Sequence, residues 1–156
     1  MNGETAFTLT LETEPSEEDL EIFSALREYN VAHVGESHAH GLILFLRDAS
    51  GKAQGGLKGT ISWEWLHITL LVLRKEWRGK GYGSRMLESA EQEAIRQGCR
   101  GVYLDTFSFQ ALPFYQKRGY EVFGTLDDYP PGHSCYFLKK FLMNSSGQTL
   151  SPRDSV

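Results

Sequence analysis

The alternation of apolar and polar residues along the chain predicts seven strands. Over residues 7–13, FTLTLET, the two types alternate, which is the period of a strand with one buried face. Residues 65–73 give the strongest signal, because they combine β-branched and aromatic side chains with a long apolar stretch. Further strands are predicted at residues 42–46, 55–63, 101–105, 120–125 and 134–141.

Apolar residues at helical spacing predict three helices. Ser16 can cap a helix over residues 17–30, whose first turn is acidic and so suits the positive end of the helix dipole. A second helix, residues 84–97, carries one apolar stripe and stops at Gly98. A short third helix covers residues 110–118. Strands and helices thus alternate, which indicates an α/β or α+β fold.

The length of the chain indicates one domain, which we expect at residues 1–142, followed by a flexible polar tail at 143–156. With 40% hydrophobic and 23% charged residues, the composition is that of an ordinary globular protein. The net charge of −4 argues against a nucleic-acid partner, because such binding relies on a basic face.

Membrane insertion, a disulfide framework and a metal site are not expected. No apolar run approaches the roughly 18 residues of a membrane span, and the acidic N-terminal segment does not have the layout of a signal peptide. Two cysteines, Cys99 and Cys135, suggest neither a disulfide framework nor a zinc site, and are expected to be reduced thiols. A cytoplasmic location is therefore expected.

A basic, glycine-rich segment, RGKGYG at residues 78–83, joins the strongest predicted strand to the second helix. The N-terminus of a helix offers unpaired backbone N–H groups, which favour a phosphate, and glycines leave these groups unshielded. Arg78 and Lys80 add positive charge beside them. A simple connector with solvated cations would have the same sequence, so the segment alone leaves both interpretations open.

Two common phosphate-binding motifs do not match this segment. The dinucleotide-binding fingerprint needs G-x-G-x-x-G tight against the end of a strand, whereas here the spacing is G-x-G-x-G and residues 74–78 intervene. A G-x-x-x-x-G-K-[ST] loop is also absent from the sequence. A nicotinamide-dependent oxidoreductase is therefore disfavoured.

Residues 78–83 instead resemble the R/Q-x-x-G-x-G/A acyl-CoA motif of the GNAT superfamily of N-acetyltransferases. Residues 71–73 resemble the strand that precedes this motif, and residues 111–120 contain a match to the later A…FY-K-GF signature, with Tyr120 in the last position. The resemblance covers most of the chain. It implies a single domain with a central, mixed, mostly antiparallel, twisted sheet of six to seven strands, flanked by helices.

The resemblance also implies that acetyl-CoA is the co-substrate. Its pyrophosphate would bind at the glycine segment and its pantetheine arm along the preceding strand. Ser108 stands where many relatives have an asparagine, so that contact is weakened or taken over by Gln110. The residues expected to bind acetyl-CoA are Leu71, Val72, Leu73, Arg78, Gly79, Lys80, Gly81, Tyr82, Gly83, Ser84, Ser108 and Gln110.

Acetyl transfer to an amine needs an acid for the leaving thiolate, a base for the amine and a donor for the oxyanion. By resemblance, Tyr115 is the candidate acid, and a backbone N–H of residues 71–73 is the oxyanion donor. His67 is the candidate base, since strand parity puts it on one face with Trp65, Thr69 and the leucines at 71 and 73. Glu64 and water are the alternatives for the base. Alternatively, Tyr115 is a tyrosine of the core and His67 is a structural histidine.

The sequence contains no motif that identifies the acceptor substrate. Trp65 can stack on an amine or belong to the core, and His133 can wall the pocket or belong to a surface turn. The sequence therefore predicts an N-acetyltransferase that moves an acetyl group to a primary amine of a small molecule or peptide by direct attack. The alternative is a non-catalytic acyl-CoA-binding module. The resemblance also allows a homodimer formed through the last strands.

Overall fold

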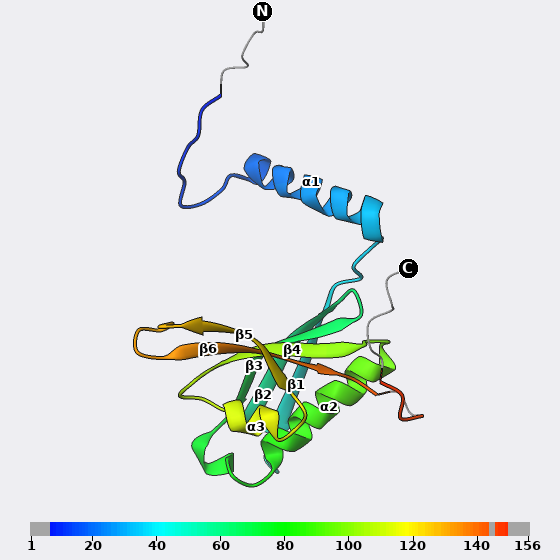
Figure 1. The fold of residues 1–156 in the computed structure, drawn as a ribbon, viewed down its shortest axis with the longest axis vertical. Helices are drawn as coiled ribbons and strands as arrows, with labels where there is room; N and C mark the ends of the chain where they lie inside the picture. Colours follow the sequence, from blue (N-terminus) through cyan, green and yellow to red (C-terminus); the bar gives the residue numbers. More distant parts are fainter. Residues whose placement is uncertain (1–6, 144–145, 150–156) are drawn as a thin grey trace, which may run out of the picture. The chain divides into compact units, whose positions relative to one another are not determined.

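The computed structural model describes residues 7–143 and 146–149, in two compact units of which the first ends at Ser37 and the second begins at His38. The first unit contains helix α1, Glu17–Val34 (Figure 1). The Ser16 hydroxyl accepts a hydrogen bond from the Asp19 N–H at 3.1 Å, and the Asp19 carboxylate accepts one from the Ser16 N–H. This capping box confirms the predicted start of the helix, which runs one turn further than expected.

The strand predicted at residues 7–13 does not form. Residues 7–12 have no regular secondary structure, and a bend follows at Thr13. A strand is stable only when its backbone pairs with another strand, and the one regular element described in the first unit is a helix. The alternating pattern was therefore misleading here, because the sequence cannot show whether a pairing partner is available.

The second unit is built on a six-stranded sheet in the order β1-β2-β3-β4-β6-β5 (Figure 1). Strands β3 and β4 are parallel, and all other neighbours are antiparallel. The predicted mixed, mostly antiparallel sheet is therefore confirmed, and two of its strands, β3 and β6, have the predicted bounds. The strands are β1 (His40–Arg47), β2 (Ala53–Ser62), β3 (Trp65–Leu73), β4 (Gly101–Phe107), β5 (Glu121–Asp127) and β6 (Ser134–Phe141).

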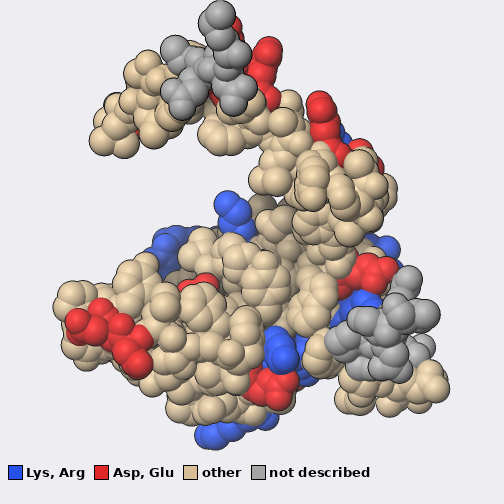
Figure 2. Space-filling view, turned by 45° about the horizontal axis from the view of Figure 1, so that its top comes forward, with Lys and Arg blue, Asp and Glu red and all other residues tan. Residues whose placement is uncertain are grey.

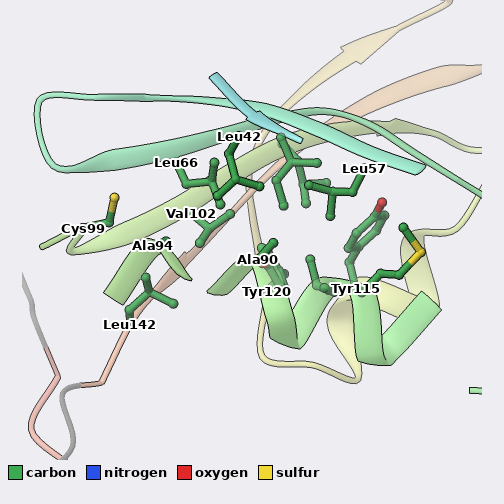
Figure 3. Packing of buried hydrophobic residues seen from close by; sticks show 14 of the residues in the cluster. Leu42, Leu57, Leu66, Ala90, Ala94, Cys99, Val102, Tyr115, Tyr120 and Leu142 are labelled. Carbon is green, nitrogen blue, oxygen red and sulfur yellow. The ribbon is translucent and has the colours of Figure 1, made fainter. Parts of the chain in front are cut away.

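Two helices, α2 (Tyr82–Arg96) and α3 (Leu112–Gln116), lie on the same face of this sheet (Figure 1). Residues of α2 and of the strands that face it form the core, which Figure 3 shows from close by. We call the opposite side of the sheet the outer face. The largest fully buried side chains are Leu57, Leu66, Leu87, Leu104, Leu138, Leu142, Val102, Cys99 and Cys135.

A β-bulge at Thr69 reverses the parity of β3. Lys58 of β2 pairs with Leu70 and Gly59 pairs with Ile68, so Thr69 has no partner residue, and its hydroxyl donates to the Lys58 carbonyl at 3.2 Å. Before the bulge, Leu66 and Ile68 are buried, while after it the leucines at 71 and 73 pack against the core. The predicted grouping of residues 65, 67, 69, 71 and 73 on one face is therefore wrong beyond the bulge.

Strands β3 and β4 also separate at this point. Their parallel pairing covers Trp65–Ile68 of β3 and Gly101–Leu104 of β4 only, although both strands continue. From Thr69 onward, the side of β3 that faces β4 has no partner among the described strands. A wedge therefore opens in the middle of the sheet.

After β6, the described chain continues through Met143 and residues 146–149. Met143 and Thr149 form an isolated bridge, and residues 144–145 and 150–156 of the predicted tail lie outside the described residues. Among the described helices, none combines the length and the apolar character needed to cross a membrane. On the face shown in Figure 2, Lys and Arg occur in small groups among Asp and Glu.

A buried carboxylate links α2 to β6. Glu91 accepts a hydrogen bond from the Tyr120 hydroxyl at 2.9 Å, and its other oxygen lies 2.8 Å from Lys140 Nζ. Burial and the Glu91 carboxylate both raise the pKa of Tyr120, which therefore stays a hydrogen-bond donor. Because Glu91 is only 8% exposed, losing its cation would leave a desolvated charge.

We predict that Lys140→Met lowers the free energy of unfolding by about 2–3 kcal/mol, because a buried carboxylate then lacks its cation. The adjacent lysine provides a control, since Lys139 pairs with the exposed Glu121 at 3.7 Å. Lys139→Met should cost less than about 1 kcal/mol. Urea unfolding of both variants measures the difference, and equal losses would contradict the role given to Glu91.

Candidate active site

The wedge between β3 and β4 opens into two cavities, of about 390 and 640 Å³. They share several lining residues, so we treat them as the two ends of one cleft. The smaller reaches the start of α2 and is called the glycine end, and the larger reaches the end of β4 and is called the Asp105 end. The shared lining residues are Leu71, Leu73, Arg78, Ala111 and Tyr115.

At the glycine end, the backbone itself is the main polar group. Gly79 and Gly81 have φ of 70° and 81°, a conformation that favours glycine, and a Cβ on either would meet open space. Gly81 is the N-cap of α2, and no side chain in the described part of the chain caps this helix end. The first N–H groups of α2 therefore lack a side-chain acceptor, which is the arrangement that attracts an anion.

Two arginines strengthen the positive charge of this end. Arg78 Nε donates to the Leu73 carbonyl at 2.9 Å, which ties the glycine segment to the end of β3. Arg118 donates to the Phe114 carbonyl at 2.7 Å and to the Ser84 hydroxyl, and its guanidinium lies 3.8 Å from the centre of the Phe114 ring. Both arginines line the cavity, so a polyanionic group would find two cations there.

Tyr115 stands where the two ends meet. Its side chain extends from α3 toward the sheet (Figure 3) and is 7% exposed, packed edge to face against Phe114 and Tyr120. Burial, reinforced by the negative charge of Asp105, raises the pKa of Tyr115 to about 12. The phenol is therefore protonated at neutral pH and can donate a hydrogen bond into the cleft.

The Asp105 end lies toward the outer face of the sheet. Asp105 alternates along β4 with the buried Leu104 and Thr106, so its carboxylate is on the side away from α2. Gln110 accepts hydrogen bonds from the Phe107 N–H at 2.9 Å and from the Thr106 hydroxyl at 3.2 Å, which holds the loop after β4 against the strand. Gln110, one of the residues expected to bind acetyl-CoA, lines this end.

Ser108 and His133 lie beside the cleft without lining it. The Ser108 hydroxyl accepts from the Ser134 N–H at 3.2 Å and lies 3.3 Å from His133 Nδ1, so it joins the end of β4 to the start of β6. The His133 ring packs edge to face on Phe109, which does line the cleft. His133 therefore borders the Asp105 end only through its contact with Phe109.

The candidate base and the candidate stacking residue are both outside the cleft lining. His67 stacks on Tyr103 with ring centres 4.3 Å apart, on the outer face. Trp65 packs edge to face on Tyr103 and Phe141, directly over Gly101, where a Cβ would lie 2.4 Å from its ring. Glu64 belongs to the turn before β3, and its carboxylate pairs with Arg100 at 3.5 Å.

The lining includes most of the predicted cofactor residues and several that sequence reasoning missed. Val72, Gly83 and Ser84 line the cleft, whereas Lys80 and Tyr82 do not, and Tyr82 packs on Trp77. The signature around Tyr115 drew attention to α3, but nothing in the sequence connected its neighbour Arg118 with Ser84. The missed lining residues are Thr69, Leu70, Asp105, Thr106, Phe107, Phe109, Ala111, Phe114 and Arg118.

Comparisons with known proteins agree on one family. A model of the acetyltransferase (GNAT) family matches residues 5–120. Blasticidin-S acetyltransferase of Streptomyces morookaense is 43% identical over 93 residues, 59% of this chain and 68% of that protein. An acetyltransferase of Agrobacterium fabrum is 35% identical over 126 residues, 78% of this chain and 92% of that protein. The crystal structure of an acetyltransferase from Bacillus cereus matches with a TM-score of 0.79 and 35% identity, covering 86% of this chain and 98% of that one.

We predict that Tyr115→Phe leaves the phenolate absorbance of the protein unchanged below about pH 10 and reduces it only near pH 12, where Tyr115 ionises. Because the folded pKa lies above the unfolded value, the stability due to this phenol is present below about pH 10 and is lost as the pH rises toward 12. A spectrophotometric pH titration of both proteins tests this. A signal that disappears near pH 10 in the variant would contradict the burial argument.

Proposed function

The chain belongs to the GNAT acetyltransferase family, and on this premise we propose that it transfers the acetyl group of acetyl-CoA to the primary amine of a small molecule or peptide. The observation that carries the proposal is the continuous cleft through the wedge between β3 and β4. One end of it is built for an anion, and a buried phenol lies at its middle.

The residues at the glycine end fit the pyrophosphate of acetyl-CoA. The uncapped N-terminus of α2 supplies N–H donors, and the positive φ of Gly79 and Gly81 presents the backbone without a Cβ in the way. Arg78 and Arg118 supply charge for the phosphate oxygens. The free side of β3 beyond Ile68 offers backbone groups to the amide groups of the pantetheine arm.

Bound acetyl-CoA supplies the thioester carbonyl that the amine attacks. We assign Tyr115 the role of hydrogen-bond donor to the sulfur as it leaves, since the protonated phenol is held at the middle of the cleft. Its raised pKa makes it a weaker acid than a free tyrosine, so stabilisation of the thiolate by a hydrogen bond comes before full proton transfer. A backbone N–H of residues 71–73 is proposed to bind the developing oxyanion.

For the proton of the amine we keep His67 as the candidate base. It lies on the outer face of the sheet, as Asp105 does, but it does not line the cleft, so the proton would reach it through water. Glu64 is less suited, because its carboxylate is paired with Arg100 in the turn before β3.

A homodimer and a cytoplasmic location are further parts of the proposal. A homodimer through the last strands is supported by the position of β5 at the edge of the sheet, where Phe123 and Leu126 are exposed. A cytoplasmic location is proposed from the sequence. A non-catalytic acyl-CoA-binding module is not favoured, since the relatives are named acetyltransferases.

We predict that Gly81→Asp weakens acetyl-CoA binding at least about 100-fold, because a carboxylate at the N-terminus of α2 would repel the pyrophosphate. Gly98→Asp is a matched control: Gly98 also has φ of 81° and open space at its Cβ, but it follows the other end of α2. The control introduces the same side chain at the same backbone conformation and should leave acetyl-CoA affinity unchanged.

Thermal stabilisation by ligand measures both variants, because a ligand that binds only the folded state raises the melting temperature. NAD serves as the parallel ligand. Stabilisation of the unmodified protein by acetyl-CoA and not by NAD is the expected result. No stabilisation by acetyl-CoA, or equal stabilisation of the Gly81→Asp variant, would refute the assignment of the glycine end.

We predict that Tyr115→Phe lowers kcat about 100-fold while the affinity for acetyl-CoA stays within about twofold, because only the hydroxyl is lost. Thiol release with a panel of amines gives kcat, and calorimetric titration gives the affinity. If the variant keeps full turnover, Tyr115 has no part in the chemistry.

A further inference from the structure

The cleft is electrically polar along its length. Arg118 lines the glycine end and Arg78 lines both ends, whereas the carboxylate among the lining residues is that of Asp105, at the other end. Within residues 7–143 and 146–149, no Lys or Arg side chain forms an ion pair with Asp105. Its carboxylate accepts a weak, long hydrogen bond from Cys135 Sγ at 3.9 Å. Arg78 also lines this cavity, but its Nε donates to the Leu73 carbonyl. The carboxylate of Asp105 thus has no ion-pair partner among the described residues.

Aromatic rings border the cavity beside this carboxylate. Phe107 and Phe109 both line it, and their rings stack with centres 5.3 Å apart and planes 11° apart. Tyr129 packs edge to face on Phe107, and His133 packs edge to face on Phe109. Phe109 is 56% exposed, so part of its surface remains open to a ligand. An anion next to aromatic surface is suited to an organic cation rather than to a metal ion.

We propose that Asp105 binds the acceptor amine in its ammonium form, and that Phe107 and Phe109 contact the carbon skeleton attached to it. The inference rests on the proposed function and names the class of acceptor: a primary amine, cationic at neutral pH, with an apolar or aromatic group next to the nitrogen. A neutral or anionic acceptor would lack a partner for the carboxylate.

The position of Asp105 also orients the acceptor. Asp105 and Tyr115 line the same cavity from β4 and α3, and the negative charge of Asp105 acts on the Tyr115 hydroxyl. An amine held by the carboxylate therefore lies in the part of the cleft where the phenol is. The ammonium must first lose one proton to water, and the neutral amine then stays in place by donating a hydrogen bond from its N–H to Asp105.

The binding test uses protein saturated with CoA, which occupies the glycine end without supplying an acetyl group. The probes are 2-phenylethylamine, a cation at neutral pH, and 2-phenylethanol, its neutral counterpart of similar size. Dissociation constants from ligand-observed NMR titrations are compared for the unmodified protein, Asp105→Asn and Asp127→Asn. Asp127, at the end of β5, keeps an acceptor for the Ser134 hydroxyl after substitution and lines neither cavity.

We expect the unmodified protein and Asp127→Asn to bind the amine at least tenfold more tightly than the alcohol. Asp105→Asn should lose this preference while binding the alcohol and CoA as before. Equal binding of the two probes by the unmodified protein, or an unchanged preference in Asp105→Asn, would overturn the proposal. Melting temperatures of the variants check that each is folded.

The same titrations separate this inference from the proposed function. Failure of the unmodified protein to bind CoA would refute the proposed function. The preference for the amine over the alcohol would then be measured on the protein without CoA, where Asp105 still faces the cavity. If CoA binds and the preference is absent, the inference about Asp105 fails alone. With an amine that is acetylated, Asp105→Asn should raise its KM at least tenfold and change kcat less than threefold.

Discussion

The separation of β3 from β4 is the constraint on which the rest of the structure depends. A sheet normally satisfies the backbone of a central strand on both sides, but β3 gives up its pairing with β4 after Ile68. The bulge at Thr69 lies at the same place and turns the leucines at 71 and 73 toward the helices. The opening thus combines free backbone groups with an apolar wall, and both cavities form there.

The core holds this opening in shape. α2 packs along β1, β2 and β3, and its N-terminus is fixed at the mouth of the cleft by Arg78, which bonds to the end of β3. Tyr115 is anchored by Phe114 and Tyr120, and Tyr120 is bound in turn to the buried Glu91 of α2. The phenol at the middle of the cleft therefore shares a buried network with the helix whose N-terminus forms the glycine end.

Charge gives the cleft a direction. The start of α2 and Arg118 are positive at one end, Arg78 lies between the ends and lines both cavities, and Asp105 is negative at the other end. Acetyl-CoA carries its phosphates far from its thioester, whereas an acceptor amine is positive close to the reacting nitrogen. A cleft with this polarity would hold the two molecules from opposite ends, with their reacting atoms between them. Burial raises the pKa of Tyr115, and the negative charge of Asp105 adds to this effect.

The sequence alone determined what depends on local order. Short-range periodicity predicts strands β3 and β6, and capping predicts the start of α1. The φ preferences of glycine account for the glycine-rich segment, residues 78–83, before α2. The family also follows from a contiguous motif and a later signature, both readable along the chain. These features need no knowledge of which segments meet in space.

Only the tertiary structure decided the rest. The pattern at residues 7–13 has the period of a strand, yet it forms none without a pairing partner among the described residues of its unit. One extra residue at Thr69 reversed the faces of β3 and separated His67 from the leucines at 71 and 73. Asp105 and Arg118 line the cleft only because the fold brings together elements that are distant in sequence. Pairing, register and long-range contacts are properties of two segments together, so neither segment encodes them by itself.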